Sequence, residues 1–441
     1  MSKVLPSGRA LVAAALAVSW VALARPAAAQ HGGPSPAPEA APQDVVGPLP
    51  PPLLRAVAFE DLPGWASDAH AEILPVVQVS CAALRPMRPE APLGGTGDAA
   101  LRAGTAASWT TLCADMRLLE RALPRPPRPG QGRAYDRRVA AWIAAKNQAV
   151  RDFIEARFEP FSAGPGIMTG YYEPVLRGAL EPDEAFRTPL YARPPELVET
   201  PVNGNPLRRQ FGMLRDGRME PFFDRAAIDN GALSGRGLEL LWVDDPTDAF
   251  FLHIQGSGRV VLPDGELLRV GYAGQNGRPY VSIGRVLIDR GDIARDQMSM
   301  QALRAWFAMA GYARTVEVFR ANPSYVFFRL VDGLTPDQGP IGAMGVPLTP
   351  QRSVAVDRAF IPLGLPMWVH LRDPTARRDA PPAGRLVVAQ DTGGAIRGPA
   401  RTDFFWGWGH EAGERAGRMR EENEVFVLLP RPAPVNTADS R

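Results

Sequence analysis

The chain has 441 residues, more than one compact core usually holds, so we expect at least two domains. Hydrophobic residues make up 45% of the sequence and charged residues 22%, as in folded globular proteins. The formal net charge is only +2, which gives no support for a nucleic-acid partner. The 46 prolines and 43 glycines favour short strands and many turns over long helices.

Residues 1–29 have the pattern of a cleaved export signal. Lys3 and Arg9 form a basic start, an apolar stretch follows over 10–24, and Ala27-Ala28-Ala29 offers small residues for cleavage. No cysteine lies near that point, so we expect no lipid anchor there. No other stretch is apolar enough to cross a membrane. The pattern predicts a mature protein exported to the periplasm, with no integral membrane segment.

The two cysteines, Cys81 and Cys113, would then lie in an oxidising compartment. A disulfide between them is the favoured interpretation. Two buried free thiols are the alternative.

The N-terminal third has a different pattern from the rest. Residues 30–52 are rich in proline and predict an extended linker. Short helical patterns follow over 53–123. The clearest helix spans Arg133–Phe158, where apolar residues recur at three- and four-residue steps, and Glu159-Pro160 ends it.

Short strands separated by turn residues dominate after Gly166, and this spacing favours a barrel or a sandwich. Two helices, Met298–Gly311 and Arg314–Ala321, interrupt them, and small residues over 412–417 suit a closely packed short helix. His253 is expected on a strand. The predicted strands are Ile167–Tyr172, Leu238–Val243, Phe250–Gln255, Arg259–Leu262, Tyr325–Leu330, Val354–Ala355, Met367–His370 and Leu386–Ala389.

Two aspartates in the segment 387–418 are candidates for acid–base chemistry. Asp391 ends an apolar run and precedes the Gly393-Gly394 pair, which lets the backbone turn tightly. Asp403 comes directly before the aromatic cluster Phe404–Trp408. Apolar surroundings favour a protonated carboxyl group, as a general acid requires. The alternative is that both aspartates only cap turns.

Three polar-aromatic clusters suit a groove that binds a hydroxyl-rich ligand such as a saccharide: 169–174 (TGYYEP), 253–258 (HIQGSG) and 271–277 (GYAGQNG). Ordinary hairpin turns are the alternative. The five histidines are scattered without metal-ligand spacing, and no nucleotide-binding loop or serine-hydrolase elbow occurs. We therefore expect no metal and no cofactor. An aspartic protease would need a second D-[ST]-G motif beside 391–393, which is missing.

These motifs together resemble the membrane-bound lytic murein transglycosylase A family. The resemblance rests on the segments 169–175, 253–258, 271–293, 298–306 and 322–328, and on the DTGGAIRG…D segment that begins at Asp391. It implies a mainly β fold with N-terminal helices: a double-psi β-barrel with an inserted second, barrel-like β-domain, and a substrate groove between them. The implied domains are 53–176 as the helical lead-in, 177–335 as the insert and 336–430 as the barrel, with a disordered tail over 431–441.

The resemblance also implies roles for individual residues. Asp403 would be the single catalytic residue, Asp391 a supporting residue and Asp357 mainly structural. The residues expected to bind the glycan strand are Tyr171, Tyr172, Glu173, Gln255, Ser257, Asn276 and Trp406.

The implied activity is that of a peptidoglycan lytic exotransglycosylase, a murein lyase. It would cleave between MurNAc and GlcNAc and form a 1,6-anhydro-MurNAc end, with one aspartate alternating as acid and base. The expected partner is the peptidoglycan glycan strand, with cell-wall or outer-membrane proteins as further candidates. A glycoside hydrolase that uses Asp391 and Asp403 as a pair and a non-catalytic peptidoglycan-binding scaffold are the alternatives.

Overall fold

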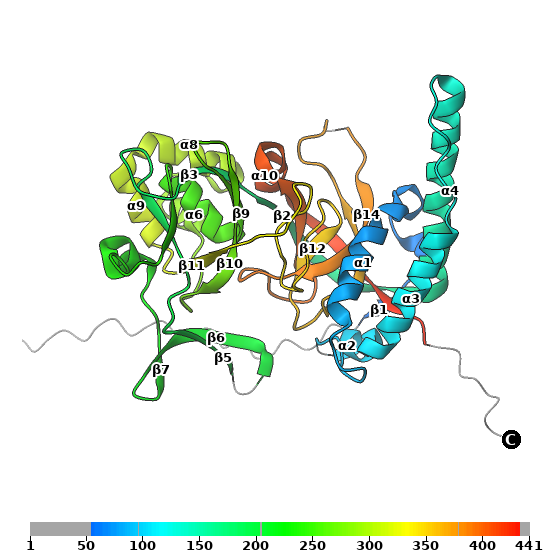
Figure 1. Ribbon diagram of the computed structural model, residues 1–441, viewed down its shortest axis with the longest axis horizontal. Helices are drawn as coiled ribbons and strands as arrows, with labels where there is room; N and C mark the ends of the chain where they lie inside the picture. Colours follow the sequence, from blue (N-terminus) through cyan, green and yellow to red (C-terminus); the bar gives the residue numbers. More distant parts are fainter. Residues whose placement is uncertain (1–53, 96, 203–204, 378, 433–441) are drawn as a thin grey trace, which may run out of the picture. The chain divides into compact units, whose positions relative to one another are not determined.

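The computed structural model describes residues 54–432 except 96, 203–204 and 378 (Figure 1). The predicted signal peptide, the whole proline-rich linker and most of the C-terminal tail lie outside these residues. The described residues form a seven-stranded sheet, a six-stranded sheet and a three-stranded sheet.

The seven-stranded sheet closes into a six-stranded barrel, with β1 (Arg55–Ala56) added at one side. Its neighbours run in the order β2-β15-β12-β14-β13-β16, and β16 pairs back onto β2. Two pairs, β2–β15 and β12–β14, are parallel, and the other pairs are antiparallel. The predicted double-psi β-barrel fold is confirmed. Its strands are β2 (Phe158–Glu173), β12 (Ser353–Val356), β13 (Pro366–Leu371), β14 (Ala383–Asp391), β15 (Thr402–Trp408) and β16 (Arg420–Pro430).

The chain leaves the barrel after β2 and builds the second sheet before it returns. This sheet has the order β11-β10-β9-β3-β8-β4. A separate three-stranded sheet, β5-β6-β7, follows β4 in the chain. The strands are β3 (Val175–Ala179), β4 (Thr188–Tyr191), β5 (Leu197–Val202), β6 (Asn205–Arg215), β7 (Arg218–Glu220), β8 (Glu239–Val243), β9 (Gly258–Val261), β10 (Leu267–Gln275) and β11 (Val326–Leu330).

The insert also carries four longer helices: α6 (Pro246–Gln255), α7 (Ile283–Arg290), α8 (Met300–Ala310) and α9 (Tyr312–Arg320). The strand predicted over Phe250–Gln255 is wrong, because this segment lies in α6, and His253 is therefore a helical residue. Asp245 caps the start of α6 by accepting from the Thr247 N–H, and Gly256 ends the helix in the left-handed region at φ 80°. A short apolar run alone does not separate a strand from a buried helix.

Helices α1 (Ile73–Leu84), α2 (Gly97–Ala103), α3 (Ala106–Ala122) and α4 (Arg133–Arg157) precede the barrel. The long helix predicted over Arg133–Phe158 is confirmed as α4. Cys81 on α1 and Cys113 on α3 form the predicted disulfide. Closing this loop of 32 residues stabilises the helical lead-in mainly by restricting the unfolded chain.

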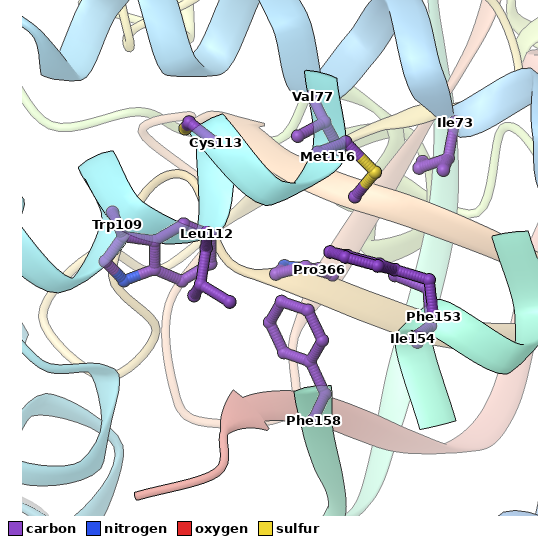
Figure 2. A pocket seen from close by; sticks show the side chains of 10 residues that line it. All are labelled: Ile73, Val77, Trp109, Leu112, Cys113, Met116, Phe153, Ile154, Phe158 and Pro366. Atoms are coloured by element: carbon purple, nitrogen blue, oxygen red, sulfur yellow. The ribbon is translucent and has the colours of Figure 1, made fainter. Parts of the chain in front are cut away.

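A small gap lies in the core between these helices and the barrel, and Figure 2 shows its lining. Its volume is about 10 Å³, room for roughly one water molecule. Because the walls are almost wholly apolar, we regard it as a packing defect and not a ligand site. The lining residues are Ile73, Val77, Trp109, Leu112, Cys113, Met116, Phe153, Ile154, Phe158 and Pro366.

A buried cluster of charged side chains links the two segments in which the chain passes between barrel and insert. Glu173, the last residue of β2, is 1% exposed, and its carboxylate accepts from Arg259 Nε at 2.8 Å and Arg269 Nη2 at 2.9 and 3.0 Å. The same arginines donate to the carbonyl oxygens of Thr335, Pro336 and Gln338, where the chain returns. Glu173 is therefore structural, which corrects the expected sugar contact at this position.

We predict that Glu173→Gln lowers the free energy of unfolding by about 3 kcal/mol, because two buried guanidinium groups lose their counter-charge. Urea titration followed by circular dichroism measures this loss. The control is Asp289→Asn, which breaks an exposed pair with Arg285 and should cost less than about 0.5 kcal/mol. Equal small losses in both variants would contradict the structural role of Glu173.

Candidate active site

The two candidate aspartates lie in one row across four neighbouring strands of the barrel. Asp403 on β15 pairs with Thr169 on β2 and, on its other side, with Ala355 on β12. Ala355 also pairs with Asp391 on β14. Paired residues point to the same face of a sheet, so the row presents two carboxyl groups on one face. One strand separates them, which sets their Cα atoms about 10 Å apart.

Asp403 is half-buried, and its Oδ1 accepts a hydrogen bond of 2.6 Å from the Thr169 hydroxyl. An apolar cluster adjoins it, formed by Tyr171, Leu348, Ala355, Ile396 and Phe405. Burial raises the pKa of the Asp403 carboxyl to about 6, although the Thr169 hydroxyl and the Arg401 charge act to lower it. The neighbouring Asp391 charge raises this pKa further. Both forms of the carboxyl are thus populated near neutral pH.

Both oxygens of Asp391 have hydrogen-bond donors. Oδ1 accepts from the Ala343 N–H at 2.9 Å, and Oδ2 accepts from the Tyr171 hydroxyl at 3.0 Å. Burial raises the pKa of Asp391, while these donors and the Thr392 N–H lower it. Tyr171 is 9% exposed, so its hydroxyl serves to orient Asp391.

Asp357 follows β12 and does not join the row of carboxyl groups. Its Oδ1 accepts from the Ala359 N–H at 3.1 Å and its Oδ2 from the Gly398 N–H at 2.8 Å. The second bond ties the loop between Asp391 and Asp403 to the end of β12. This geometry fits a structural role that fixes the loop.

The opposite face of β2 borders a separate open cavity of about 270 Å³. Tyr172 points to this face, because successive strand residues alternate, and Gln255 accepts from the Tyr172 N–H at 3.0 Å. Residues of the barrel and of the insert line this cavity together. They include Gly170, Tyr172, Gln255, Tyr280, Ser299 and Gly417.

Two further residues that were expected to contact the ligand are buried, and their polar side-chain atoms contact other parts of the protein. Asn276 has 0% exposure and donates to the carbonyl oxygens of Phe223 and Pro323. Trp406 is 5% exposed, and its Nε1 lies 3.1 Å from the Met419 sulfur. These contacts correct the expected sugar-binding role of both residues. Ser257, 9% exposed, lies between the end of α6 and the start of β9.

Two residues of the site were not among the candidates from the sequence. Thr169 opens the TGYYEP cluster, and its motif could have indicated it. Arg401 donates to the Thr169 hydroxyl at 2.8 Å, and no motif indicated it. Within the part of the chain that the structure describes, no group of three or more His, Cys, Asp or Glu side chains could hold a metal ion. No helix in that part is long and apolar enough to cross a membrane.

Comparison with known proteins gives matches along most of the described chain. Residues 167–329 match the MltA specific insert domain and residues 352–429 match the 3D domain. A crystal structure of the membrane-bound lytic murein transglycosylase from Agrobacterium tumefaciens is similar with a TM-score of 0.70 and 37% identity, covering 86% of this chain and 98% of that one. The chain belongs to the membrane-bound lytic murein transglycosylase A family.

Other members of the family extend this comparison. The Escherichia coli membrane-bound lytic murein transglycosylase A is 37% identical over 271 residues, which is 61% of this chain and 67% of that protein. The Vibrio cholerae protein is 34% identical over 270 residues, covering 60% of this chain and 66% of that protein. The match thus spans about two thirds of these relatives. A structure of E. coli MltA with bound chitohexaose is similar with a TM-score of 0.55 and 31% identity, covering 73% of this chain and 85% of that one.

For this family member we predict that Asp403→Asn is more stable than the wild type above pH 7. A carboxyl whose pKa rises from 3.8 to about 6 on folding stabilises the folded state below pH 4, and this contribution is lost as the pH rises through 6. Asparagine does not ionise, so the stability of the variant lacks this pH-dependent change. We expect a difference of about 2–3 kcal/mol at pH 8 that vanishes near pH 4, measured by urea unfolding across this range. Parallel stability profiles would contradict the raised pKa.

Proposed function

We propose that this protein is a murein lytic transglycosylase in which Asp403 alone supplies the proton and later removes one. It cleaves the β-1,4 bond between MurNAc and GlcNAc and leaves a 1,6-anhydro-MurNAc end. The observation that carries the proposal is a half-buried carboxyl group with a pKa of about 6 beside an apolar cluster. Such a group can act as an acid and then as a base at neutral pH.

The reaction has two proton transfers. Protonated Asp403 donates its proton to the oxygen between MurNAc C1 and GlcNAc C4, and the bond from C1 to this oxygen breaks. The GlcNAc part leaves with a 4-hydroxyl group. The Asp403 carboxylate then takes the proton from the MurNAc 6-hydroxyl as O6 bonds to C1. The carboxyl ends protonated, and the net reaction consumes no water.

The environment of Asp391 supports this mechanism over a two-carboxylate hydrolase. A hydrolase needs a second carboxylate that is free to attack the sugar or to activate water. Both Asp391 oxygens already accept hydrogen bonds, from Ala343 and Tyr171. Asp391 therefore orients the site, and its charge adds to the effect of burial, which is the main cause of the raised Asp403 pKa.

The substrate proposal rests on the family. The related E. coli MltA structure contains chitohexaose. We assign peptidoglycan glycan strands as the substrate and the periplasm as the site of action, in agreement with the export pattern of residues 1–29.

We predict that Asp403→Asn lowers the release of anhydro-muropeptides from purified murein by at least about 100-fold, since the general acid is lost. Asp391→Asn should lower it less, because that residue orients the site without transferring a proton. Liquid chromatography with mass spectrometry measures the products. Anhydro products from Asp403→Asn at the wild-type rate would remove the assignment of the acid.

The mass of the wild-type product separates the alternatives. A hydrolase adds one water molecule for each cleaved bond, whereas a lytic transglycosylase adds none. Binding of murein without any released muropeptide would instead favour a non-catalytic scaffold.

A further inference from the structure

A chain of two hydrogen bonds leads from Arg401 to Asp403 through a neighbouring strand. Arg401 Nη2 donates to the Thr169 Oγ1 at 2.8 Å, and Thr169 Oγ1 donates to Asp403 Oδ1 at 2.6 Å. Arg401 Nη1 also donates to the carbonyl oxygen of Ile167 at 3.2 Å, which fixes the guanidinium against β2. Arg401 and Asp403 are two residues apart, so they lie on the same side of the chain as it enters β15.

The direction of each proton in this chain follows from the chemistry of the groups. A guanidinium has five N–H donors and no acceptor, so the Thr169 oxygen must accept from Arg401. A threonine hydroxyl has a single proton, and that proton points along the 2.6 Å contact to Asp403 Oδ1. Oδ1 is therefore an acceptor in both protonation states of Asp403.

The second oxygen of Asp403 has a different environment. Oδ2 has no hydrogen-bond partner among the residues that the structure describes. It is also not fully buried. When the carboxyl group is neutral, its proton must then lie on Oδ2, because a proton on Oδ1 would face the Thr169 proton.

We propose that Arg401 is a positioning residue for the catalytic acid: through Thr169 it confines the transferable proton of Asp403 to Oδ2. Without Arg401, the Thr169 hydroxyl could rotate and accept from Asp403 instead, and the proton would divide between the two oxygens. Only the proton on one oxygen is aimed at the glycosidic bond, so a divided proton lowers the rate of the chemical step. This inference rests on the proposed function, in which Asp403 is the acid.

Several charged or titratable groups surround this chain. Arg401 lowers the pKa of Asp403, while Asp391 on β14 raises it. Burial lowers the pKa of Arg401 itself, Asp403 raises it, and Arg420 on β16 lowers it. The Tyr171 hydroxyl on β2 binds Asp391, and its pKa lies well above 10.0 because of burial. Removal of the Arg401 charge should therefore move the Asp403 titration to higher pH.

The test compares Arg401→Met with the wild type in murein digestion across the pH range. We expect kcat to fall roughly 10-fold while KM stays within about two-fold, because proton positioning and not binding changes. The alkaline limb of the pH profile, which reports the acid, should move to higher pH. Arg401→Lys should return the alkaline limb to its wild-type pH, since lysine keeps the charge. It should recover only part of kcat, since lysine lacks the planar guanidinium group.

A double-mutant cycle separates the relay from two independent effects. If Arg401 acts through Thr169, Arg401→Met should leave kcat nearly unchanged in a protein whose Thr169 is already replaced by valine. If the double variant instead loses kcat by the product of the two single-variant factors, the proposal is overturned. Arg431→Met is the matched control. Arg431 directly follows β16, is exposed and pairs with Glu159, so its replacement should leave both rate and pH profile unchanged.

A readout without substrate separates this proposal from the proposed function. The pH step in unfolding stability that belongs to Asp403 should move to higher pH in Arg401→Met and stay in place in Arg431→Met. A step that does not move would overturn the role of Arg401, whatever the activity. If the step moves but wild-type protein releases no anhydro products from murein, the proposed function fails while the contact between Arg401, Thr169 and Asp403 stands.

Discussion

The pairing of β15 between β2 and β12 is the constraint on which the candidate site depends. This register sets Asp403 beside Thr169 on one side and Ala355 on the other, and Ala355 in turn leads to Asp391. A slip of β15 by one residue would turn Asp403 into the core and bring Thr402 or Phe404, both fully buried here, to the site. Several contacts hold the register, among them the bond from the Gln351 N–H to the Phe405 carbonyl oxygen at 2.7 Å. The placement of the acid is thus a property of strand pairing.

The chemistry of Asp403 comes from opposing influences, of which burial is the largest. An apolar cluster that includes Tyr171 and Phe405 disfavours the carboxylate, whereas the Thr169 hydroxyl and the Arg401 charge favour it. The effect of burial is the larger one, which raises the pKa of Asp403 to about 6. Asp391 differs because donors from Ala343 and Tyr171 bind both of its oxygens. Two carboxyl groups in one row therefore take different roles because their neighbours differ.

The sequence predicted four of the six barrel strands and marked both aspartates as candidates, because apolar runs that end at turn residues and glycine pairs are local signals. The sequence did not predict strands β15 and β16. It was not sufficient for the contact between Thr169 and Asp403, which lie 234 residues apart and meet only after β2 and β15 pair. Glu173 and Asn276 looked like ligand contacts because polar residues in aromatic motifs suit a sugar. Their partners, such as Arg269, lie too far along the chain to be inferred. Helix α6 was predicted as a strand, although Asp245-Pro246 was an available helix-start signal.

The cluster around Glu173 has a consequence for how such a two-part protein can arise. One side chain, Arg269, touches both the residue at which the chain leaves the barrel and the carbonyl oxygens of Thr335 and Gln338, where it comes back. The two ends of the 162-residue excursion over 174–335 therefore lie next to each other. To the barrel, the whole second sheet with its helices is topologically equivalent to one surface loop. Since the entropy of closing a loop grows only slowly with its length, an ancestral barrel could have gained the insert at this point while keeping its own strand order.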